Sequence, residues 1–263
     1  MRAGLILPVV LRCALLATAG CGSTTGGARI EFPAAAAGPE DADGGPLAFD
    51  SALGYRVTLT RARLHIGGLY LNQSVPTSGS QATECTLPGI YVAQVLGAVD
   101  LDLLSPALQP FPVNGEGTTL PATAGEVWLT GGAIDTVDDA TVILDSAGSA
   151  TRGAESYPFE ARLTISQNRL IPTSDPAAPG ANPICKRRIV SPIPVALQPR
   201  AGRTLVLRVD PRGLFASVDF AEVPKVADAP PLYRFSDRPD NPADINLFAG
   251  LRARTGVYTF IWP

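Results

Sequence analysis

The clearest hydrophobic pattern in the chain lies in the run Tyr55–Leu71, where apolar and polar residues alternate. Alternation with a period of two is typical of a half-buried β-strand. The phase shifts by one residue at Thr60–Arg61, and such a shift would turn every later side chain to the opposite face of a sheet. A β-bulge at this point would keep the apolar residues toward the core. We therefore expect Leu59 and Leu64 to be buried on the two sides of a bulge.

The polar residues of the same run define the solvent side of the expected strand. Because side chains alternate between the two faces of a strand, we expect Arg61 and His65 to be more exposed than their apolar neighbours. The run is also far longer than the ordinary strand of about 5–6 residues. We therefore expect it to bend, or to divide into two strands, at Gly67–Gly68.

Shorter segments of the same kind recur along the chain and are separated by turn residues. Many short strands with glycine and proline turns are typical of a sandwich or barrel of antiparallel strands. No window shows a convincing helical period, and for 214–220 both a helical turn and a strand stay open. We predict one antiparallel β-sandwich domain over residues 46–263, with long Pro/Gly-rich loops. The expected strands are 28–32, 47–49, 90–96, 99–104, 126–130, 140–144, 157–166, 189–197, 203–210 and 257–262.

Prolines and turn residues limit what the remaining segments can form. Pro192 and Pro194 lack the N–H group that a central strand donates, so 189–197 is expected at the edge of a sheet. A turn is expected at 145–148, after the strand that precedes it. The expected long loops are 34–45, 72–88, 106–121, 172–183 and 224–242.

Composition and charge narrow the class of function. Hydrophobic residues make up 46% of the chain, which is enough to fill a core. The net charge is −3, and the chain has no long block of Lys and Arg. Because nucleic-acid binding needs clustered basic side chains to neutralise phosphates, we expect no nucleic-acid partner.

Residues 1–20 have the layout of a secretory signal, with a charged start, an apolar middle and small residues at the end. The end, Ala17–Cys21, resembles the lipobox of bacterial lipoproteins, although Thr18 stands where Leu is usual. The resemblance implies cleavage before Cys21 and attachment of a diacylglycerol to this residue, with 21–45 as a flexible tether. It places the protein in the bacterial cell envelope, anchored at the outer membrane or at a periplasmic face. The alternative is an ordinary signal peptide and secretion.

Cys85 and Cys185 remain once the signal and the lipobox cysteine are set aside. An even pair in an exported protein most simply forms one disulfide. The bond would close a loop of about 100 residues, for which chain entropy gives roughly 4–5 kcal/mol of stabilisation. The alternative is a thiol pair that binds metal or changes its redox state, and this alternative lacks a C-x-x-C arrangement.

The chain offers little for nucleophilic catalysis. His65 is its single histidine and no G-x-S-x-G segment occurs, whereas most nucleophilic triads need a histidine base. We therefore expect no enzyme and no cofactor. Asp135, Asp138 and Asp139 have the density of a calcium loop but not the order of an EF-hand. These three residues and His65 are the candidate metal ligands, and turn capping or an exposed strand position is the alternative for them.

Aromatic side chains could form a platform for a ligand. Stacking on sugar rings would suit a sandwich, with Trp128, Tyr233 and Trp262 as the main candidates and Tyr70 and Tyr91 beside them. The alternative is that these rings fill the core.

Two segments, Gly54–Ile66 and Val209–Phe215, resemble periplasmic copper-binding proteins of the methanobactin-associated type, over about a third of the chain. That family handles copper with histidine and a modified tryptophan. The resemblance implies a copper site at His65 with Trp128 or Trp262, and no motif maps these residues onto the family's pattern.

Taken together, the sequence favours a non-enzymatic, lipid-anchored envelope protein that acts as a binding or structural module, with a membrane as one partner and a protein or glycan as another. Two alternatives stay open. One is a periplasmic protein that binds copper or calcium. The other is a carbohydrate-active enzyme, which would need two carboxylates facing each other in a cleft.

Overall fold

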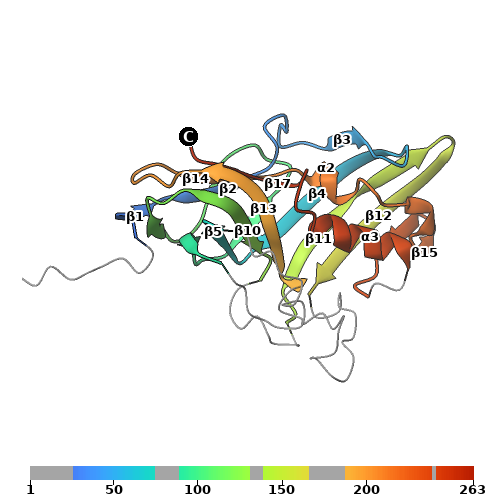
Figure 1. Ribbon diagram of the computed structural model, residues 1–263. Coiled ribbons are helices and arrows are strands. Elements are labelled where there is room, and N and C mark those ends of the chain that lie inside the picture. Colours follow the sequence, from blue (N-terminus) through green and yellow to red (C-terminus); the bar gives the residue numbers. More distant parts are fainter. Residues whose placement is uncertain (1–25, 75–88, 131–138, 166–186, 239–240) are drawn as a thin grey trace, which may run out of the picture.

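The computed structural model describes residues 26–74, 89–130, 139–165, 187–238 and 241–263. These residues form three β-sheets of six, seven and four strands, so the fold is all-β and sandwich-like, as the sequence predicts. Figure 1 shows β4, β11 and β12 running together toward one end of the molecule, with β1, β5 and β10 at the other end. No helix among the described residues has the length and apolarity needed to cross a lipid bilayer.

The six-stranded sheet carries the candidate site described below. All five of its strand pairings are antiparallel. Strand β13 closes one edge, as the two prolines of this strand predict. In order across the sheet, the strands are β1 (Arg29–Phe32), β9 (Gly115–Thr118), β6 (Tyr91–Val95), β5 (Gly68–Asn72), β10 (Ala122–Trp128) and β13 (Ile189–Leu197).

The other two sheets complete the fold. Two pairings are parallel, that of β12 with β16 and that of β14 with β2. The seven-stranded sheet runs β15 (Lys225–Asp228), β16 (Pro231–Arg234), β12 (Glu155–Thr164), β11 (Val142–Arg152), β4 (Arg56–Ile66) and β3 (Leu47–Asp50), with β7 (Val99–Asp102) also paired to β4. The four-stranded sheet runs β17 (Tyr258–Ile261), β14 (Leu205–Val209), β2 (Ala34–Ala37) and β8 (Gln109–Pro110).

The bulge predicted in β4 is confirmed. Arg61 lies opposite Ala147 while Leu59 lies opposite Gly148, so Thr60 is the extra residue. Leu59 and Leu64 are both fully buried, whereas Arg61 is exposed and His65 is half-buried.

The glycine opposite the bulge has a steric reason. A β-carbon on Gly148 would lie 2.1 Å from the carbonyl oxygen of Thr58, so only glycine permits this approach of the two backbones. The expected bend at Gly67–Gly68 is also confirmed, because β4 belongs to the seven-stranded sheet and β5 begins the next strand in the six-stranded sheet. The long alternating run is therefore two strands that join two sheets.

The prediction that 34–45 is loop or linker is wrong for Ala34–Ala37. This segment is strand β2, it lies between β14 and β8, and all four of its alanines are buried. Four alanines carry no alternation of apolar and polar residues, so the local pattern hides a strand whose partner β14 lies far along the chain. Strands β1 and β2 thus lie well before residue 46, where the sequence places the start of the domain.

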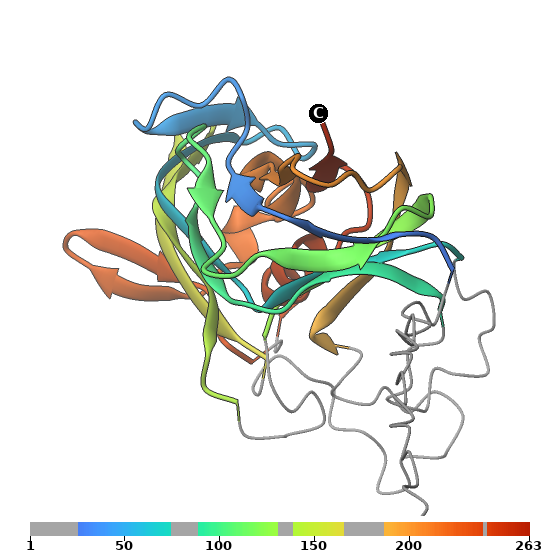
Figure 2. The same cartoon turned by 90° about the vertical axis from the view of Figure 1, so that its left-hand side faces the viewer.

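Three other predicted loops and turns contain regular structure. The segment 106–121 holds β8 and β9, and 224–242 holds the hairpin of β15 and β16. The turn expected at 145–148 is absent from the described β11, which continues as a strand to Arg152. The hairpin of β15 and β16 projects from the side of the molecule in Figure 2.

Helical turns occupy the segment after β14 and the segment before β17. For residues 214–220 the sequence left both a strand and a helical turn open. The segment runs from the last residue of helix α2 (Pro211–Leu214) to the first residue of the 3₁₀ helix η2 (Phe220–Glu222). Helix α3 (Pro242–Leu251) is not predicted by the hydrophobic pattern, and Asn241 caps it by accepting a hydrogen bond from the backbone N–H of Asp244.

One hydrophobic cluster joins all three sheets and the helices. The six-stranded sheet meets the four-stranded sheet so closely that a β-carbon on Gly125 in β10 would come within 2.5 Å of the Phe260 ring in β17. Gly125 and Val127 therefore face the core. The side chains of Glu126 and Trp128, which alternate with them along β10, lie on the other face of this sheet.

Candidate functional site

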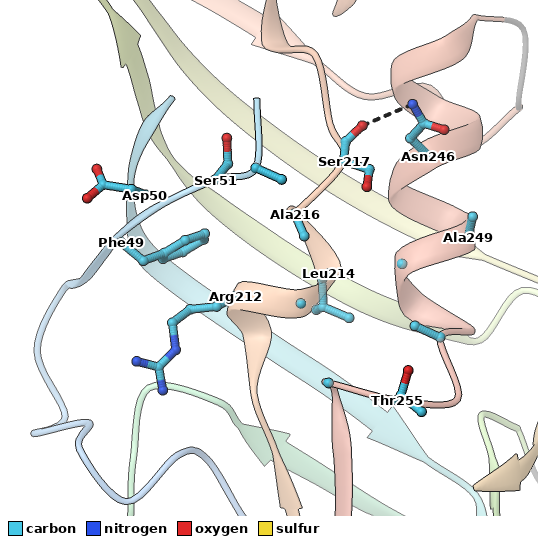
Figure 3. A pocket seen from close by; sticks show the side chains of 15 residues that line it. Phe49, Asp50, Ser51, Arg212, Leu214, Ala216, Ser217, Asn246, Ala249 and Thr255 are labelled. Atoms are coloured by element: carbon cyan, nitrogen blue, oxygen red, sulfur yellow. Dashed lines mark hydrogen bonds between the residues drawn. The ribbon is translucent and has the colours of Figure 1, made fainter. Parts of the chain in front are cut away.

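A cleft of about 640 Å³ opens between β3, α2 and α3 (Figure 3). Small side chains and backbone form most of its wall, because α2 and α3 approach closely at glycines. A β-carbon on Gly250 would lie 2.2 Å from the carbonyl oxygen of Leu214. The residues that line the cleft are Phe49, Asp50, Ser51, Ala52, Arg212, Gly213, Leu214, Ala216, Ser217, Asn246, Ala249, Gly250, Ala253, Thr255 and Gly256.

The charged groups of this cleft are already paired. Arg212 donates two hydrogen bonds of 2.8 Å to Asp41 and a further one of 2.8 Å to Asp210, and its side chain points away from Asn246 in Figure 3. Asp50 accepts a hydrogen bond of 3.2 Å from Arg56. The cleft thus has space for a small ligand but presents no reactive or unpaired charged group.

A different candidate site lies on β10, at the carboxylate of Glu126, on the face of the strand opposite to the core cluster. Glu126 is only 1% exposed. Its Oε2 accepts hydrogen bonds from the Trp128 indole N–H at 3.3 Å and from the Tyr91 hydroxyl at 3.4 Å. Its Oε1 accepts one from the Ser191 hydroxyl at 3.0 Å, and the side chain of Asn72 donates another.

All of these donors are uncharged. Within the described part of the chain, no Lys or Arg lies at ion-pair distance from Glu126. Burial raises the pKa of the Glu126 carboxyl above its ordinary value, and the hydrogen bonds that it accepts offset part of this rise. Glu126 is therefore a carboxylate in a low-dielectric position to which the described residues supply no countercharge.

Three aromatic rings gather around this carboxylate from three neighbouring strands. Tyr70 in β5 lies between the other two, with ring centroids 4.7 Å from Trp128 in β10 and 5.3 Å from Tyr91 in β6. Each of the three side chains is partly exposed. Burial, followed by the charge of Glu126, raises the pKa of both tyrosines, so both stay protonated hydrogen-bond donors. We call Tyr70, Tyr91, Trp128 and Glu126 the aromatic–carboxylate face.

The register of the sheet extends this face into a row. Directly paired residues of an antiparallel sheet point to the same side, and Glu126 pairs with Tyr70, which pairs with Gln94, then Glu116, then Glu31. Gln94 donates a hydrogen bond of 2.8 Å to Glu116. Glu116 also forms a long, exposed ion pair of 4.0 Å with Arg29.

The structure brings together only part of the aromatic platform that the sequence predicts. Trp128 lies next to Tyr70 and Tyr91, so these three of the five candidate rings are together. Tyr233 instead packs on Tyr157 in the seven-stranded sheet, with ring centroids 5.2 Å apart. Trp262 packs on Phe32 at 4.5 Å, so the expected trio of Trp128, Tyr233 and Trp262 does not form one surface.

Glu126 is the residue that the sequence does not reveal. It occupies a polar position of the alternating segment EVWLT, for which the pattern predicts solvent exposure. The prediction of the faces is otherwise right, since Val127 and Leu129 are fully buried and Trp128 lies on the other side. Only the pairing of β10 with β5 and β13 shows that Glu126 is enclosed.

The candidate metal ligands are engaged in other contacts where the structure describes them. His65 Nδ1 lies 2.7 Å from Asp100 Oδ1, across the pairing of β4 with β7. Asp139 accepts hydrogen bonds from Arg188 at 2.8 Å and from the backbone N–H of Thr141 at 3.0 Å. Among the described residues, no three His, Cys, Asp or Glu side chains come together as a metal site would require.

The remaining predicted site residues lie outside the described ranges. These are Asp135 and Asp138 of the calcium hypothesis, Cys21 of the lipobox, and the Cys85–Cys185 pair. Lipidation and the disulfide therefore stay predictions.

Comparison with known proteins adds no relative. No protein-family model, no curated protein and no solved structure matches the chain. The geometry of the aromatic–carboxylate face must therefore carry any functional argument by itself.

Proposed function

We propose that the protein is a non-enzymatic, lipid-anchored binding module of the bacterial cell envelope, and that its ligand docks on the aromatic–carboxylate face. The observation that carries this proposal is the gathering of Tyr70, Tyr91 and Trp128 from three strands onto one side of a sheet, where all three stay partly exposed. Rings used only as core filling would be enclosed, as Phe159 and Phe215 are.

Rigid strands suit such a binding surface. The three rings stand on β5, β6 and β10, which are joined by antiparallel pairing, and their contacts with each other limit their rotation. A ligand therefore meets a surface that is already ordered, which reduces the entropic cost of binding. The hydrogen bonds from Tyr91 and Trp128 to Glu126 fix two of the rings further.

The non-enzymatic part of the proposal is supported by the surroundings of Glu126. Catalysis by paired carboxylates needs a second acid facing the first, whereas the groups that contact Glu126 are neutral hydrogen-bond donors. No second carboxylate is among the groups that contact it in the described residues. The chemistry of this face is that of recognition.

The anchor is tested by metabolic labelling with radioactive palmitate. We expect label and membrane attachment in the wild-type protein and loss of both in Cys21→Ala, because a lipid chain on this residue would hold the protein at a membrane. Cys13→Ala, in the signal region, is the matched control and should keep the label. Equal labelling of Cys21→Ala and wild type would contradict the anchor.

The binding face is tested by its access to a small solute. In a Trp262→Phe protein, Trp128 is the sole tryptophan, and we expect acrylamide to quench its fluorescence because the ring is partly exposed. Trp128→Phe, which leaves Trp262 against Phe32, is the reciprocal protein for comparison. Complete protection of Trp128 from acrylamide would contradict a binding role for this face.

A further inference from the structure

We propose that the aromatic–carboxylate face binds an organic cation, specifically the primary ammonium group of an alkylamine or of a larger amine ligand. This inference rests on the proposed function and names the ligand chemistry of the same site.

The first argument is the missing countercharge of Glu126. A buried carboxylate is costly unless it is paired, and the four groups that donate to Glu126 are all neutral. Arg188, which is equally buried, has the Asp139 carboxylate at 2.8 Å. A cation bound beside Glu126 would supply the countercharge that the described residues do not.

The second argument is the chemistry of the rings. The faces of tyrosine and tryptophan carry negative potential, and a cation within about 6 Å of a ring centroid is attracted by it. Tyr70, Tyr91 and Trp128 bring three such rings together, with neighbouring centroids 4.7 and 5.3 Å apart. A cation at this face would therefore interact with several rings and a carboxylate at once.

The third argument is the charge of the row. Glu31, Glu116 and Glu126 are three carboxylates on one side of the sheet, and Arg29 is the basic side chain paired in it. One positive and three negative charges leave a local balance of −2. The row crosses four strand spacings of about 4.8 Å, so roughly 19 Å of surface attracts positive groups and repels anions.

The fourth argument is an acceptor that lacks a donor. Asn72 is 1% exposed, and its Oδ1 has no hydrogen-bond partner among the described residues. The same side chain donates to Glu126 through its amide nitrogen, so the amide is a neighbour of the carboxylate, with its oxygen toward Gly89. A buried acceptor without a donor is unfavourable, and a primary ammonium group brings three N–H donors. A quaternary ammonium ion would bring none.

The test compares ligands that differ only in charge or in donors. The Trp262→Phe full-length protein is titrated with hexylammonium, with the neutral analogue hexan-1-ol, and with trimethylhexylammonium, while Trp128 fluorescence and heat of binding are followed. We expect hexylammonium to bind about tenfold or more tightly than the alcohol, and more tightly than the trimethylated cation. Its affinity should fall with added salt.

Glu126→Gln is the variant that removes the charge and keeps the shape. We expect it to weaken hexylammonium binding by about tenfold and to leave the weak binding of the alcohol unchanged. Glu155→Gln is the matched control, because Glu155 is an exposed acid of the seven-stranded sheet, and it should bind as wild type does. If Glu126→Gln does not fold, the affinities of hexylammonium and hexan-1-ol for the Trp262→Phe protein still show whether the site prefers a cation.

Two results would overturn the inference in distinguishable ways. If the alcohol binds as tightly as the amine, or if a neutral chitotetraose alone binds and depends on Trp128, the ligand is not a cation although the binding face stands. If none of these probes affects Trp128, the cation site and the proposed binding face both fall. Failure of palmitate labelling would affect the anchor alone.

Discussion

Arg188 and Glu126 are two charged side chains buried to the same extent beside adjoining strands, yet their charges are balanced in opposite ways. Both are 1% exposed. Arg188 pairs with Asp139 at 2.8 Å and also donates to Thr130 at 3.3 Å, whereas Glu126 is held by neutral donors. A charge that the chain neutralises itself serves the fold. A charge to which the described residues supply no countercharge is suited to a partner from outside.

The pKa values of the Asp139 and Glu126 carboxyls shift in opposite directions. Burial raises the pKa of Asp139, but hydrogen bonds from Thr141 and the charge of Arg188 more than offset this, so it lies below its ordinary value. For Glu126, burial dominates and the pKa lies above its ordinary value. Glu126 is buried more deeply than Asp139, whose side chain is 15% exposed. Asp139 also has a guanidinium within reach, and both differences separate the pKa values of the two carboxyls.

Breaking the paired charge should give the largest loss of stability. Arg188→Met keeps much of the side-chain volume but leaves Asp139 without its cation, and we expect the free energy of unfolding to fall by about 3 kcal/mol. Equilibrium unfolding in urea measures this change. The matched control is Arg56→Met, which breaks an exposed ion pair with Asp50 and should cost less than about 1 kcal/mol. Equal losses in the two variants would show that Asp139 does not depend on Arg188.

Removing the whole carboxyl group of Glu126 should lower the free energy of unfolding by less than Arg188→Met does. Glu126→Ala leaves the donors of Tyr91, Trp128 and Ser191 without their acceptor, and we expect a loss of about 2 kcal/mol in urea unfolding. Glu116→Ala, at an exposed position of the same row, should change stability little. If the two alanine variants are equally stable, the buried hydrogen bonds of Glu126 are not maintained in solution.

Removing only the charge of Glu126 should have the smallest effect, and one that depends on pH. The raised pKa means that the folded state binds the proton more tightly, so wild-type stability falls as pH rises from the ordinary glutamate pKa of about 4.3 through the raised value. Glu126→Gln can still accept from Trp128 with its amide oxygen and donate to Ser191 with its amide nitrogen. The variant should therefore lose this decline and be at least as stable as wild type at neutral pH.

Unfolding free energies of both proteins between pH 4 and pH 8 measure this effect. The stability of wild type relative to Glu126→Gln should decrease over the range. A constant difference, or one that grows in favour of wild type, would mean that Glu126 is not desolvated in the folded state.

The parts of the fold that sequence could predict are those with a local pattern. The bulge at Thr60 follows from a phase shift within one strand, and the edge position of β13 follows from its two prolines. In each case neighbouring residues contain all the information that the prediction needs.

The parts that sequence could not predict depend on distant partners or on broken patterns. Strand β2 is all alanine and becomes a strand only between β14 and β8. In α3, the buried Asp244 and the exposed Ile245 interrupt the apolar stripe, although Asn241 and Pro242 are a readable helix start. The enclosure of Glu126 requires Tyr91 and Ser191, which come from other strands.

The early start of the folded chain sets how far the protein could reach from a membrane. Strand β1 begins at Arg29 and is paired with β9, so 29 − 21 = 8 Cα-to-Cα steps separate it from the proposed lipidated cysteine. Eight such steps span at most about 28 Å when the chain is fully extended. An anchored domain would thus sample only a layer of about that depth next to the lipid. Its ligand would have to be present at the membrane surface, where confinement of both partners raises their effective concentration.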